Sequence, residues 1–572
     1  MRNKYNLAEL FSGIGSQCKA LKNLGLEINT LATCEWDVHA VIAYDILHSK
    51  NISIPDEIAS MKKKELLEKL KEFTFSNSGK EPLEYDSLKS YSENTLKHIL
   101  ASITRNRNRV DISTINGKDM PWNIDILTYS FPCQDLSNVG AFHGYNKGID
   151  KNSGSRSSLL WQVGRILSEM RAAAISLPRF LLMENVPTLL SARHKKNFDV
   201  WLSDLENLGY VNQYYELNAS SFGLPQNRPR LLMISVLTGT DSAEREFVKK
   251  YFEGKSAEDV INDYHRSDYY HQYTIAELLR TDYTNKDLYE EALECTPNDT
   301  ESRRKIWQDN PQLILPDGKI NPAYDTIRTI TTKQDRNPNS GNIYFESGVD
   351  GRGTFRYLTP RECMLFMGFN DNDYEKLKQN NIEFHKGDAL FARDKVIRMA
   401  GNSIPVKLLE GVFLQILQLD ELLTEFHRHR KENLFGVEKL DEECNSIRSY
   451  MHRHGLRSRL GDKYYPENAD IAYPKYKSAV YIYDCFSHGH SCKDLALSDN
   501  NNLYLEQLSH SMQEQDKAEQ QKVIAKGWNV IILWTCELTP TQRDTTLAWL
   551  EKTVRNNFGN KTTVGEIMTY GG

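Results

Sequence analysis

One of the nine cysteines, Cys133, lies between a proline and a glutamine just after an apolar segment. Residues 124–129 have the composition of a strand, and Pro132 must end it because proline fixes φ and lacks a backbone N–H. A thiol held at the end of a strand, where ligands collect in open α/β sheets, is a candidate nucleophile. The alternative is a buried structural role, since free cysteine is among the most buried residue types.

Further charged groups lie at the ends of other apolar segments. Glu184 follows the segment 179–183 and is a candidate general acid, with a helix cap as the alternative. Arg228 and Arg230 precede the strand-like segment 231–236. Because alternate residues of a strand project to one face, this pair suits an anion or the edge of a base. A solvated strand edge is the alternative.

The elements that must position these groups begin near the N-terminus with a predicted strand, a glycine turn and a helix. Gly13 and Gly15 allow a tight turn and the close approach of a ligand to the helix that follows. A second predicted strand, 28–34, ends at Glu35 and Trp36, where a carboxylate suits ribose hydroxyls and an indole suits adenine. The final glycine of the dinucleotide fingerprint is absent, so a turn needed only for packing is the alternative.

Taken in order, these segments resemble one family, the C5-cytosine DNA methyltransferases, over roughly residues 5–420. The resemblance implies a Rossmann-like, S-adenosylmethionine-dependent α/β domain with a small target-recognition domain. The segments that carry it are the glycine turn 11–16, Asp111-Ile112, Pro132-Cys133-Gln134, 156–161, Glu184-Asn185-Val186, 226–230 and Gly401-Asn402-Ser403.

The resemblance implies a role for each of these residue types. Cytosine C5 is a poor nucleophile, so the Cys133 thiolate adds to C6 and divides a hard step into easier ones. Glu184 neutralises charge at N3, and Arg228 braces the carbonyl oxygen of the base and the Cys133 loop, supported by Arg230. The target cytosine lies inside the stack of double-stranded DNA, so it must flip out. The implied S-adenosylmethionine-binding residues are Phe11, Gly13, Gly15, Glu35, Trp36, Asp111, Ile112, Pro132, Asn402 and Ser403.

The same reading divides the chain into domains. An insertion spans residues 51–110. Within it, residues 62–71 predict a charged amphipathic helix with a solvated face, and a helix flanking DNA is the alternative. The recognition region is polar and aromatic, and no base code can be derived from it. The expected boundaries are 1–240 and 326–425 for the catalytic domain, 51–110 for its insertion, 240–325 for the target-recognition region, 426–440 for a basic linker and 441–560 for a second domain.

The second domain contains a cluster of cysteines and histidines. Segments 473–483 and 528–534 predict strands, and 516–525 predicts a helix. Three cysteines and one histidine at this spacing could close a tetrahedral structural zinc site, with a metal-free reduced cluster as the alternative. The candidate zinc ligands are Cys485, His490, Cys492 and Cys536.

Residues 455–492 resemble the very-short-patch-repair (Vsr) endonucleases, which nick DNA at T·G mismatches. The resemblance implies a restriction-endonuclease-like α/β fold in which Asp470 carries magnesium and His488 is the general base. The pattern departs from that family where Tyr483 replaces a histidine, Ser487 replaces a tryptophan and Cys444 stands nearest the position of a glutamate. One secure carboxylate is thin support for magnesium, so cleavage activity stays open.

Composition is consistent with an intracellular enzyme. Of the nine cysteines, three belong to the candidate zinc cluster and one is the candidate catalytic thiol, which argues against a disulfide framework. No long apolar segment indicates a membrane span. A net charge of −6 requires local basic surfaces for phosphate contacts. We expect a cytoplasmic, nucleoid-associated protein of bacterial or phage type that acts on DNA as a monomer, with a cognate restriction endonuclease as a candidate partner.

Three functions therefore compete at the level of the sequence. The favoured one is methylation of cytosine C5 in DNA. A relative that methylates RNA is the second, because one branch of the family acts on transfer RNA, but the long recognition region favours DNA. The third is a DNA-repair protein whose main activity is mismatch cleavage.

Overall fold

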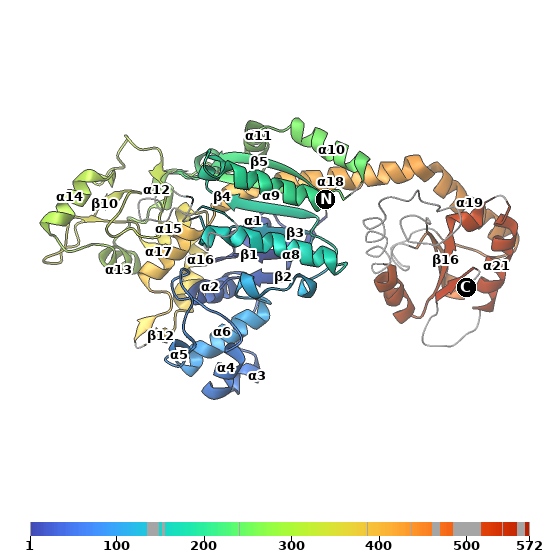
Figure 1. Cartoon of the computed structure of the whole chain (residues 1–572), viewed down its shortest axis with the longest axis horizontal. Helices are drawn as coiled ribbons and strands as arrows, with labels where there is room; N and C mark the ends of the chain where they lie inside the picture. The colour runs from blue at the N-terminus through green and yellow to red at the C-terminus, as the bar shows by residue number, and fades with distance from the viewer. Residues whose placement is uncertain are drawn as a thin grey trace. The chain divides into compact units, whose positions relative to one another are not determined.

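The chain folds into two compact units, Met1–Asp420 and Glu421–Gly572 (Figure 1). The computed structural model describes residues 2–133, 136, 148–150, 155–239, 241–385, 387–435, 437–459, 469–483, 516–539, 541–557 and 567–570. Helix α18 (Val406–Phe435) contains the boundary between the units, and α19 (Val437–Arg453) follows it, so the described residues of the predicted linker are helical. Within these described ranges, no helix is long and apolar enough to cross a membrane.

The first unit is built on a six-stranded sheet with the order β2-β1-β3-β4-β7-β5. The strands β2, β1, β3 and β4 run parallel, whereas β7 is antiparallel to both β4 and β5. The carboxyl ends of the four parallel strands therefore lie along one edge, where open α/β sheets bind ligands. The strands are β1 (Lys4–Leu10), β2 (Glu27–Cys34), β3 (Ile126–Tyr129), β4 (Phe180–Asn185), β5 (Tyr210–Asn218) and β7 (Pro229–Leu237).

Helices cover this sheet on both faces. On one face, α8 (Leu160–Ala172) and α9 (Lys195–Asn207) share a core with the strands, centred on the fully buried Trp201. On the other face, the Tyr5 hydroxyl donates a 2.8 Å hydrogen bond to Asp420 of α18. Because Tyr5 and Ala8 project to opposite sides of β1, these contacts place the two helical layers on opposite faces.

The insertion between β2 and β3 is helical. It contains α3 (Asp56–Ala59), α4 (Lys63–Leu70), α5 (Tyr85–Leu88) and α6 (Glu93–Arg105), and it follows α2 (Val38–His48). The helix predicted over 62–71 is confirmed as α4. Its Leu66 and Leu70 are buried against α6 while Lys64 and Lys69 are exposed, as expected for a solvated face.

The region predicted over 240–325 differs from the structure at both of its ends. Helices α10 (Ser242–Glu253) and α11 (Ala257–His265) pack against β5 of the main sheet, so they belong with that sheet. A separate three-stranded sheet, β11-β10-β8, extends past residue 325 because β10 pairs with both other strands. Its elements are α12 (Ile275–Leu278), α13 (Lys286–Glu294), α14 (Glu301–Asp309), β8 (Gln312–Ile314), β10 (Asn342–Tyr344) and β11 (Phe355–Arg356).

The remaining elements of the first unit return the chain to the main sheet. Strand β6 (Gln226–Asn227) pairs in parallel with β9 (Ile327–Arg328). This pairing joins the segment of Arg228 and Arg230 to the chain that leads into β10. The others are α1 (Ser16–Asn23), α15 (Pro360–Phe366), α16 (Asp371–Gln379), β12 (Glu383–His385), β13 (Asp388–Ala389) and α17 (Arg393–Asn402).

The second unit contains a four-stranded sheet with the order β14-β15-β16-β17. Both faces of the sheet are buried: Val480 and Ile482 pack into one core, and Tyr481 and Tyr483 into the other. The predicted strands and the helix 516–525 are confirmed. The elements are β14 (Ile471–Tyr473), β15 (Ser478–Tyr483), β16 (Asn529–Trp534), α21 (Arg543–Asn556) and β17 (Ile567–Thr569).

Candidate active site

The loop that carries Cys133 is held by side chains from two other segments. The Asn185 side chain, 1% exposed, donates a 3.0 Å hydrogen bond to the Phe131 carbonyl. The Ser157 hydroxyl donates to the Pro132 carbonyl at 2.6 Å. Cys133 itself is half-buried. These two cross-links, which the sequence did not predict, place the thiol at the end of β3.

Glu184 and Arg230 form an ion pair beside this loop. The distance from Arg230 Nε to the Glu184 carboxylate is 2.8 Å, and both side chains are nearly buried. The helix-cap alternative for Glu184 is therefore wrong. Burial raises the pKa of Glu184 above its ordinary value, although the Arg230 and Arg228 charges act in the opposite direction. A carboxyl group in this position holds a proton at higher pH than a free glutamate.

Arg228 makes different contacts from its neighbour. Its guanidinium donates to the carbonyls of Ile330 at 2.7 Å, and of Gly401 and Ser403, each at 2.8 Å, and the residue is 2% exposed. The solvated-edge alternative is therefore wrong for this pair. Arg228 binds three carbonyls from two other segments of backbone, whereas Arg230 is the arginine paired with Glu184.

Opposing effects act on the pKa of the Cys133 thiol. Burial raises the pKa of Cys133 above its ordinary value, while Arg230 and Arg228 lower it and Glu184 raises it. Because Asn185 of β4 holds the Cys133 loop, and Glu184 and Arg230 pair between β4 and β7, the groups lie at the ends of neighbouring strands, where they can act on one substrate. The thiolate form is favoured wherever the arginine charges face it and the glutamate is protonated.

The glycine turn between β1 and α1 combines a packing role with open space. A Cβ on Gly15 would lie 2.3 Å from His48 Nε2, so this position must be glycine for packing alone. A Cβ on Gly13 would meet nothing within 4 Å. The neighbouring Ser12 hydroxyl is buried and has no hydrogen-bond partner within the described residues. Space next to an unsatisfied hydroxyl is what a bound polar ligand requires.

The other predicted cofactor residues line the same edge. The Glu35 carboxylate accepts from the Gly13 N–H at 2.9 Å and the Asp37 N–H at 2.8 Å, and burial raises its pKa to about 7. Asp111 caps the short 3-10 helix Ile112–Thr114 through a 2.9 Å bond from the Ser113 N–H. Phe11, Trp36 and Pro132 are half-buried, Ile112 and Ser403 are buried, and Asn402 is exposed at the end of α17.

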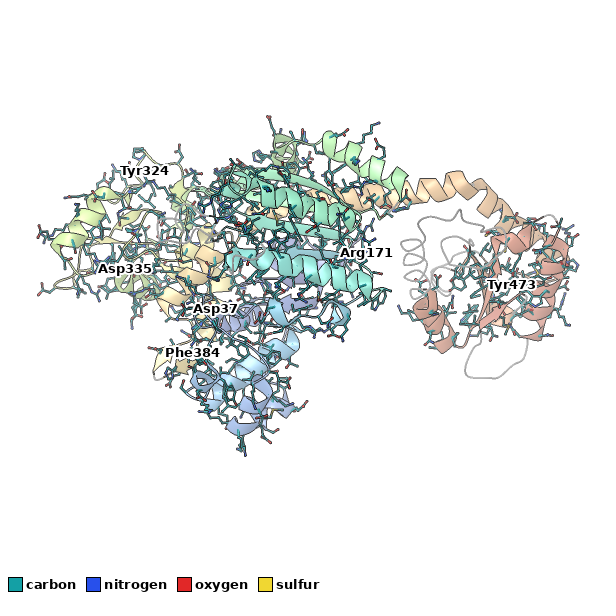
Figure 2. All side chains as sticks on the ribbon, in the orientation of Figure 1. Asp37, Arg171, Tyr324, Asp335, Phe384 and Tyr473 are labelled. Carbon is teal, nitrogen blue, oxygen red and sulfur yellow. The ribbon has the colours of Figure 1, made fainter. Side chains whose placement is uncertain are left out.

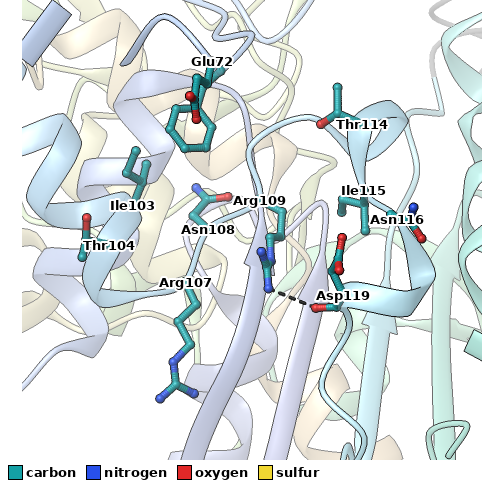
Figure 3. Close-up of a pocket in the computed structure, with 11 residues that line it drawn as sticks. Glu72, Ile103, Thr104, Arg107, Asn108, Arg109, Thr114, Ile115, Asn116 and Asp119 are labelled. Atoms are coloured by element: carbon teal, nitrogen blue, oxygen red, sulfur yellow. Dashed lines mark hydrogen bonds between the residues drawn. The ribbon is translucent and has the colours of Figure 1, made fainter. Parts of the chain in front are cut away.

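A hollow of about 450 Å³ lies beside this edge, between the insertion and the short 3-10 helices (Figure 3). Its lining carries charges of both signs, from Arg107, Arg109, Glu72 and Asp119. None of the predicted site residues lines it. One lining residue, Asn108, binds the main chain of Glu35 through both its oxygen and its nitrogen, each at 3.0 Å.

The second unit places its predicted chemical groups differently. An Asp470 oxygen accepts a 2.6 Å hydrogen bond from the Ile482 N–H. Tyr483 is 8% exposed, accepts a 3.1 Å bond from Gln520, and its ring lies 5.8 Å from that of Trp534. Cys536 is half-buried in a 3-10 helix, Thr535–Leu538. The candidate residues outside the described parts are Gln134, Cys485, Ser487, His488, His490 and Cys492.

Metal ligands are not brought together by the part of the chain that the structure covers. Across those residues, no three or more histidine, cysteine, aspartate or glutamate side chains are arranged to hold an ion. Most of the predicted zinc ligands fall outside it, so the zinc site stays a prediction. The magnesium site also stays a prediction, because Asp470 is described but His488 lies outside the described residues.

Two known methyltransferases are similar to this chain over nearly all of their own length. The chain is 31% identical over 420 residues to the orphan methyltransferase M.SssI of Spiroplasma monobiae, covering 72% of this chain and 97% of that protein. It is 29% identical to the type II methyltransferase M2.ScrFI of Lactococcus lactis subsp. cremoris, covering 72% and 98%. Among solved structures, S. pombe Dnmt2 is 16% identical with a TM-score of 0.44, covering 72% of this chain and 98% of that one.

Two family profiles match in succession. Residues 428–494 match the DNA mismatch endonuclease Vsr profile, which confirms the resemblance of the second unit. Residues 87–418 match the C-5 cytosine-specific DNA methylase profile, which spans all the predicted catalytic residues. With the relatives above, this match shows that the chain belongs to the C-5 cytosine-specific DNA methylase family.

Proposed function

We propose that this protein methylates C5 of cytosine in double-stranded DNA, using S-adenosylmethionine as the methyl donor and Cys133 as the nucleophile. The observation that carries the proposal is the meeting of Cys133, Glu184 and Arg230 at the same sheet edge as the glycine turn. A thiol, a carboxyl group of raised pKa and a cation together supply a nucleophile, a proton and an anion-stabilising group.

The glycine-turn edge fits the cofactor. When bound, S-adenosylmethionine supplies an electrophilic methyl group. The open space at Gly13 and the unpartnered Ser12 hydroxyl leave room and a polar contact for it. Glu35 suits the ribose hydroxyls, Trp36, Asp111 and Ile112 suit the adenine, and the turn at Asn402 suits the methionine end. Phe11, Gly15, Pro132 and Ser403 shape the same edge.

The catalytic residues divide the reaction between them. The Cys133 thiolate bonds to C6 of the cytosine, the electron pair of the C5–C6 double bond shifts to C4–C5, and the C4–N3 pair takes up the proton that Glu184 donates to N3. C5 of this enamine then takes up the methyl group, a neutral thioether leaves, and N3 returns its proton to Glu184. Loss of the C5 proton to water restores the double bond and expels the sulfur as thiolate. Each charge that develops is met by a group already in place, which is how such sites lower a barrier.

The arginines take roles opposite to those first expected. Arg230 pairs with Glu184, so we assign it to the carbonyl oxygen of the base. Arg228 uses its guanidinium on three carbonyls, so we assign it to positioning of the Gly401–Ser403 turn. A buried, fully bonded guanidinium is better suited to holding backbone than to contacting substrate.

DNA is the substrate that the fold favours. A target base must leave the duplex stack to reach a thiol at the sheet edge. The small sheet and its helices, which we assign to target selection, form a substantial body on the same unit. We also assign the protein to the cytoplasm as a monomer on DNA, with a cognate restriction endonuclease as a candidate partner.

Sequencing of methylated cytosines tests this function. Full-length protein is incubated with S-adenosylmethionine and unmethylated DNA, and in parallel with transfer RNA. We expect 5-methylcytosine in a defined DNA sequence and none in the RNA. Methylation of RNA with none on any DNA would contradict the proposal.

For the second unit, we propose that the Vsr-like fold is kept without magnesium-dependent cleavage. Tyr483 is buried among aromatic rings where the related endonucleases have a histidine, and the Asp470 carboxylate is engaged by backbone. Structural zinc on Cys485, His490, Cys492 and Cys536 stays part of the proposal. Elemental analysis of the purified full chain tests it: about one zinc per chain is expected, and protein that is folded but free of zinc would contradict it.

A further inference from the structure

The insertion holds the end of β2 through its main chain. The Ser76 N–H donates to the Trp36 carbonyl at 2.8 Å, and the Val38 N–H donates to the Ser76 carbonyl at 2.9 Å. Ser76 is fully buried. Asn108, at the other end of the insertion, binds both main-chain groups of Glu35. The residues assigned to the ribose and adenine are thus fixed from two sides by a segment outside the motifs.

A second set of contacts meets at Asp37, which follows Trp36 in the chain. Asp37 is labelled in Figure 2, as is Phe384. Its carboxylate accepts from the His39 ring at 3.1 Å and from Arg398 of α17 at 2.6 Å. The His39 ring packs against Phe384, with centroids 4.6 Å apart. Asp37 therefore joins the end of β2 to the helix that ends in the Asn402 turn.

Gly79 connects this cluster to the catalytic loop. A Cβ on Gly79 would lie 3.3 Å from the Asp37 carboxylate, and φ is +64°. The Gly79 carbonyl accepts a hydrogen bond from Arg156, the first residue of the 3-10 helix Arg156–Leu159. The next residue, Ser157, donates to the Pro132 carbonyl. An unbroken series of contacts runs from the end of β2 to the base of the Cys133 loop.

We propose that residues 75–79 of the insertion, which we name the bracket, are a positioning element for methyl transfer. The bracket fixes the cofactor-binding end of β2 and Arg156 relative to one another, so that filling the cofactor site stabilises residues 156–159 and, through Ser157, the Pro132 carbonyl that precedes Cys133. Small displacements of reacting groups cost large factors in rate, so such a link matters even without substrate contact. The inference rests on the proposed use of S-adenosylmethionine.

The variant Gly79→Ala tests the bracket. Its Cβ would displace the Asp37 carboxylate or the Gly79 carbonyl. The matched control is Gly25→Ala, because Gly25 has a φ of +78° with nothing within 4 Å of a Cβ. Both variants carry the same backbone strain, but only one touches the bracket. Ser76→Ala is a milder second variant, since it removes the two bonds of the hydroxyl, to the Glu81 carbonyl and from the Ser78 N–H, and leaves the bonds that the Ser76 backbone makes to Trp36 and Val38.

Two measurements on the full chain separate the outcomes. Calorimetry with S-adenosylhomocysteine should show about fivefold to tenfold weaker binding for Gly79→Ala than for wild type and Gly25→Ala. Hydrogen exchange should show that S-adenosylhomocysteine protects residues 156–159 in wild type and the control, but much less in Gly79→Ala and partly less in Ser76→Ala.

Equal affinity and equal protection in all four proteins would overturn the bracket while leaving the proposed function intact. A Gly79→Ala protein that melts earlier yet binds and protects like the control has only lost stability, and this also overturns it. If Gly79→Ala does not fold, unchanged affinity and protection in Ser76→Ala overturn it. No binding by wild type would overturn both the bracket and the proposed function.

Discussion

The two units place chemical groups at strand ends in opposite ways. In the first unit, Cys133, Glu184 and Arg230 meet at one edge of the sheet, and their charges act on one another. In the second, Asp470 and Tyr483 lie near the ends of β14 and β15, but each is engaged by its own fold. A backbone N–H uses the carboxylate, and aromatic packing encloses the phenol ring.

The difference among the described residues teaches that a complete sheet need not bring reactive groups together at its strand ends. Parallel strands bring their carboxyl ends to one edge whatever residues they carry, so the sheet alone does not make a site. What distinguishes the first unit is that its supporting contacts, from Asn185, Ser157 and Arg228, hold backbone and leave the reactive groups facing one another.

The largest expected effect is that of Cys133→Ala. The thiol is the only group assigned to bond formation with the base, so methyl transfer should fall by about 10⁴-fold or more. S-adenosylhomocysteine affinity, measured by calorimetry, should stay within about twofold, because the glycine turn is untouched. Methylation by the variant at a rate near that of wild type would refute the assignment.

Glu184→Gln should reduce the single-turnover rate by about 10²- to 10³-fold. In wild type, the raised pKa of Glu184 keeps its proton available, and that proton is lost as pH rises through this pKa. The Cys133 thiolate forms as pH rises toward its own raised pKa. The pH profile should therefore be bell-shaped, and the variant should lose the falling limb at high pH. An unchanged profile would remove Glu184 from the chemistry.

The two arginines should separate stability from catalysis. Arg228→Lys replaces a fork that serves three carbonyls with a single ammonium group, so the free energy of unfolding should fall by about 2–4 kcal/mol. Arg230→Lys should change stability little and lower the single-turnover rate by about tenfold. Denaturant titration and rapid-quench assays measure the two quantities. The reverse pattern would restore the first assignment of Arg228 to the base.

The smallest expected effect belongs to the second unit. Asp470→Asn should leave methyl transfer unchanged, and neither it nor wild type should nick a T·G mismatched duplex in magnesium buffer. A gel assay measures nicking of the duplex, with a catalytically active Vsr-type endonuclease as the positive control. Nicking by wild type that Asp470→Asn abolishes would show that the second unit has kept its activity, and the contrast between the units would fail.

Local patterns in the sequence were enough to predict the sheet edge. Apolar segments that end in polar residues predict parallel strands, and Cys133, Glu184 and the glycine turn were found in this way. The helix α4 was predicted from its charge pattern, and the strands of the second unit from their apolar runs. Each of these depends on contacts within a few residues of the chain.

Long-range contacts were beyond the reach of the sequence. Arg228 and Arg230 project to the same face, so nothing local could show that Ile330 and Gly401 capture one of them. The need for glycine at Gly15 comes from His48, on another helix. The small sheet extends past residue 325 because β10 pairs with β8, a contact between segments far apart in the chain.

The central claim is that the Cys133 sulfur bonds to C6 of cytosine in DNA, and a mechanism-based trap tests it most directly. In DNA whose cytosines carry fluorine at C5, the sulfur can add and the methyl group can transfer, but no C5 proton is present to leave. Full-length protein is incubated with this DNA and S-adenosylmethionine, then analysed by intact mass and peptide mapping. We predict a stable protein–DNA adduct mapped to Cys133 and absent in Cys133→Ala. An adduct on another cysteine, or none while unmodified DNA is methylated, would contradict the account.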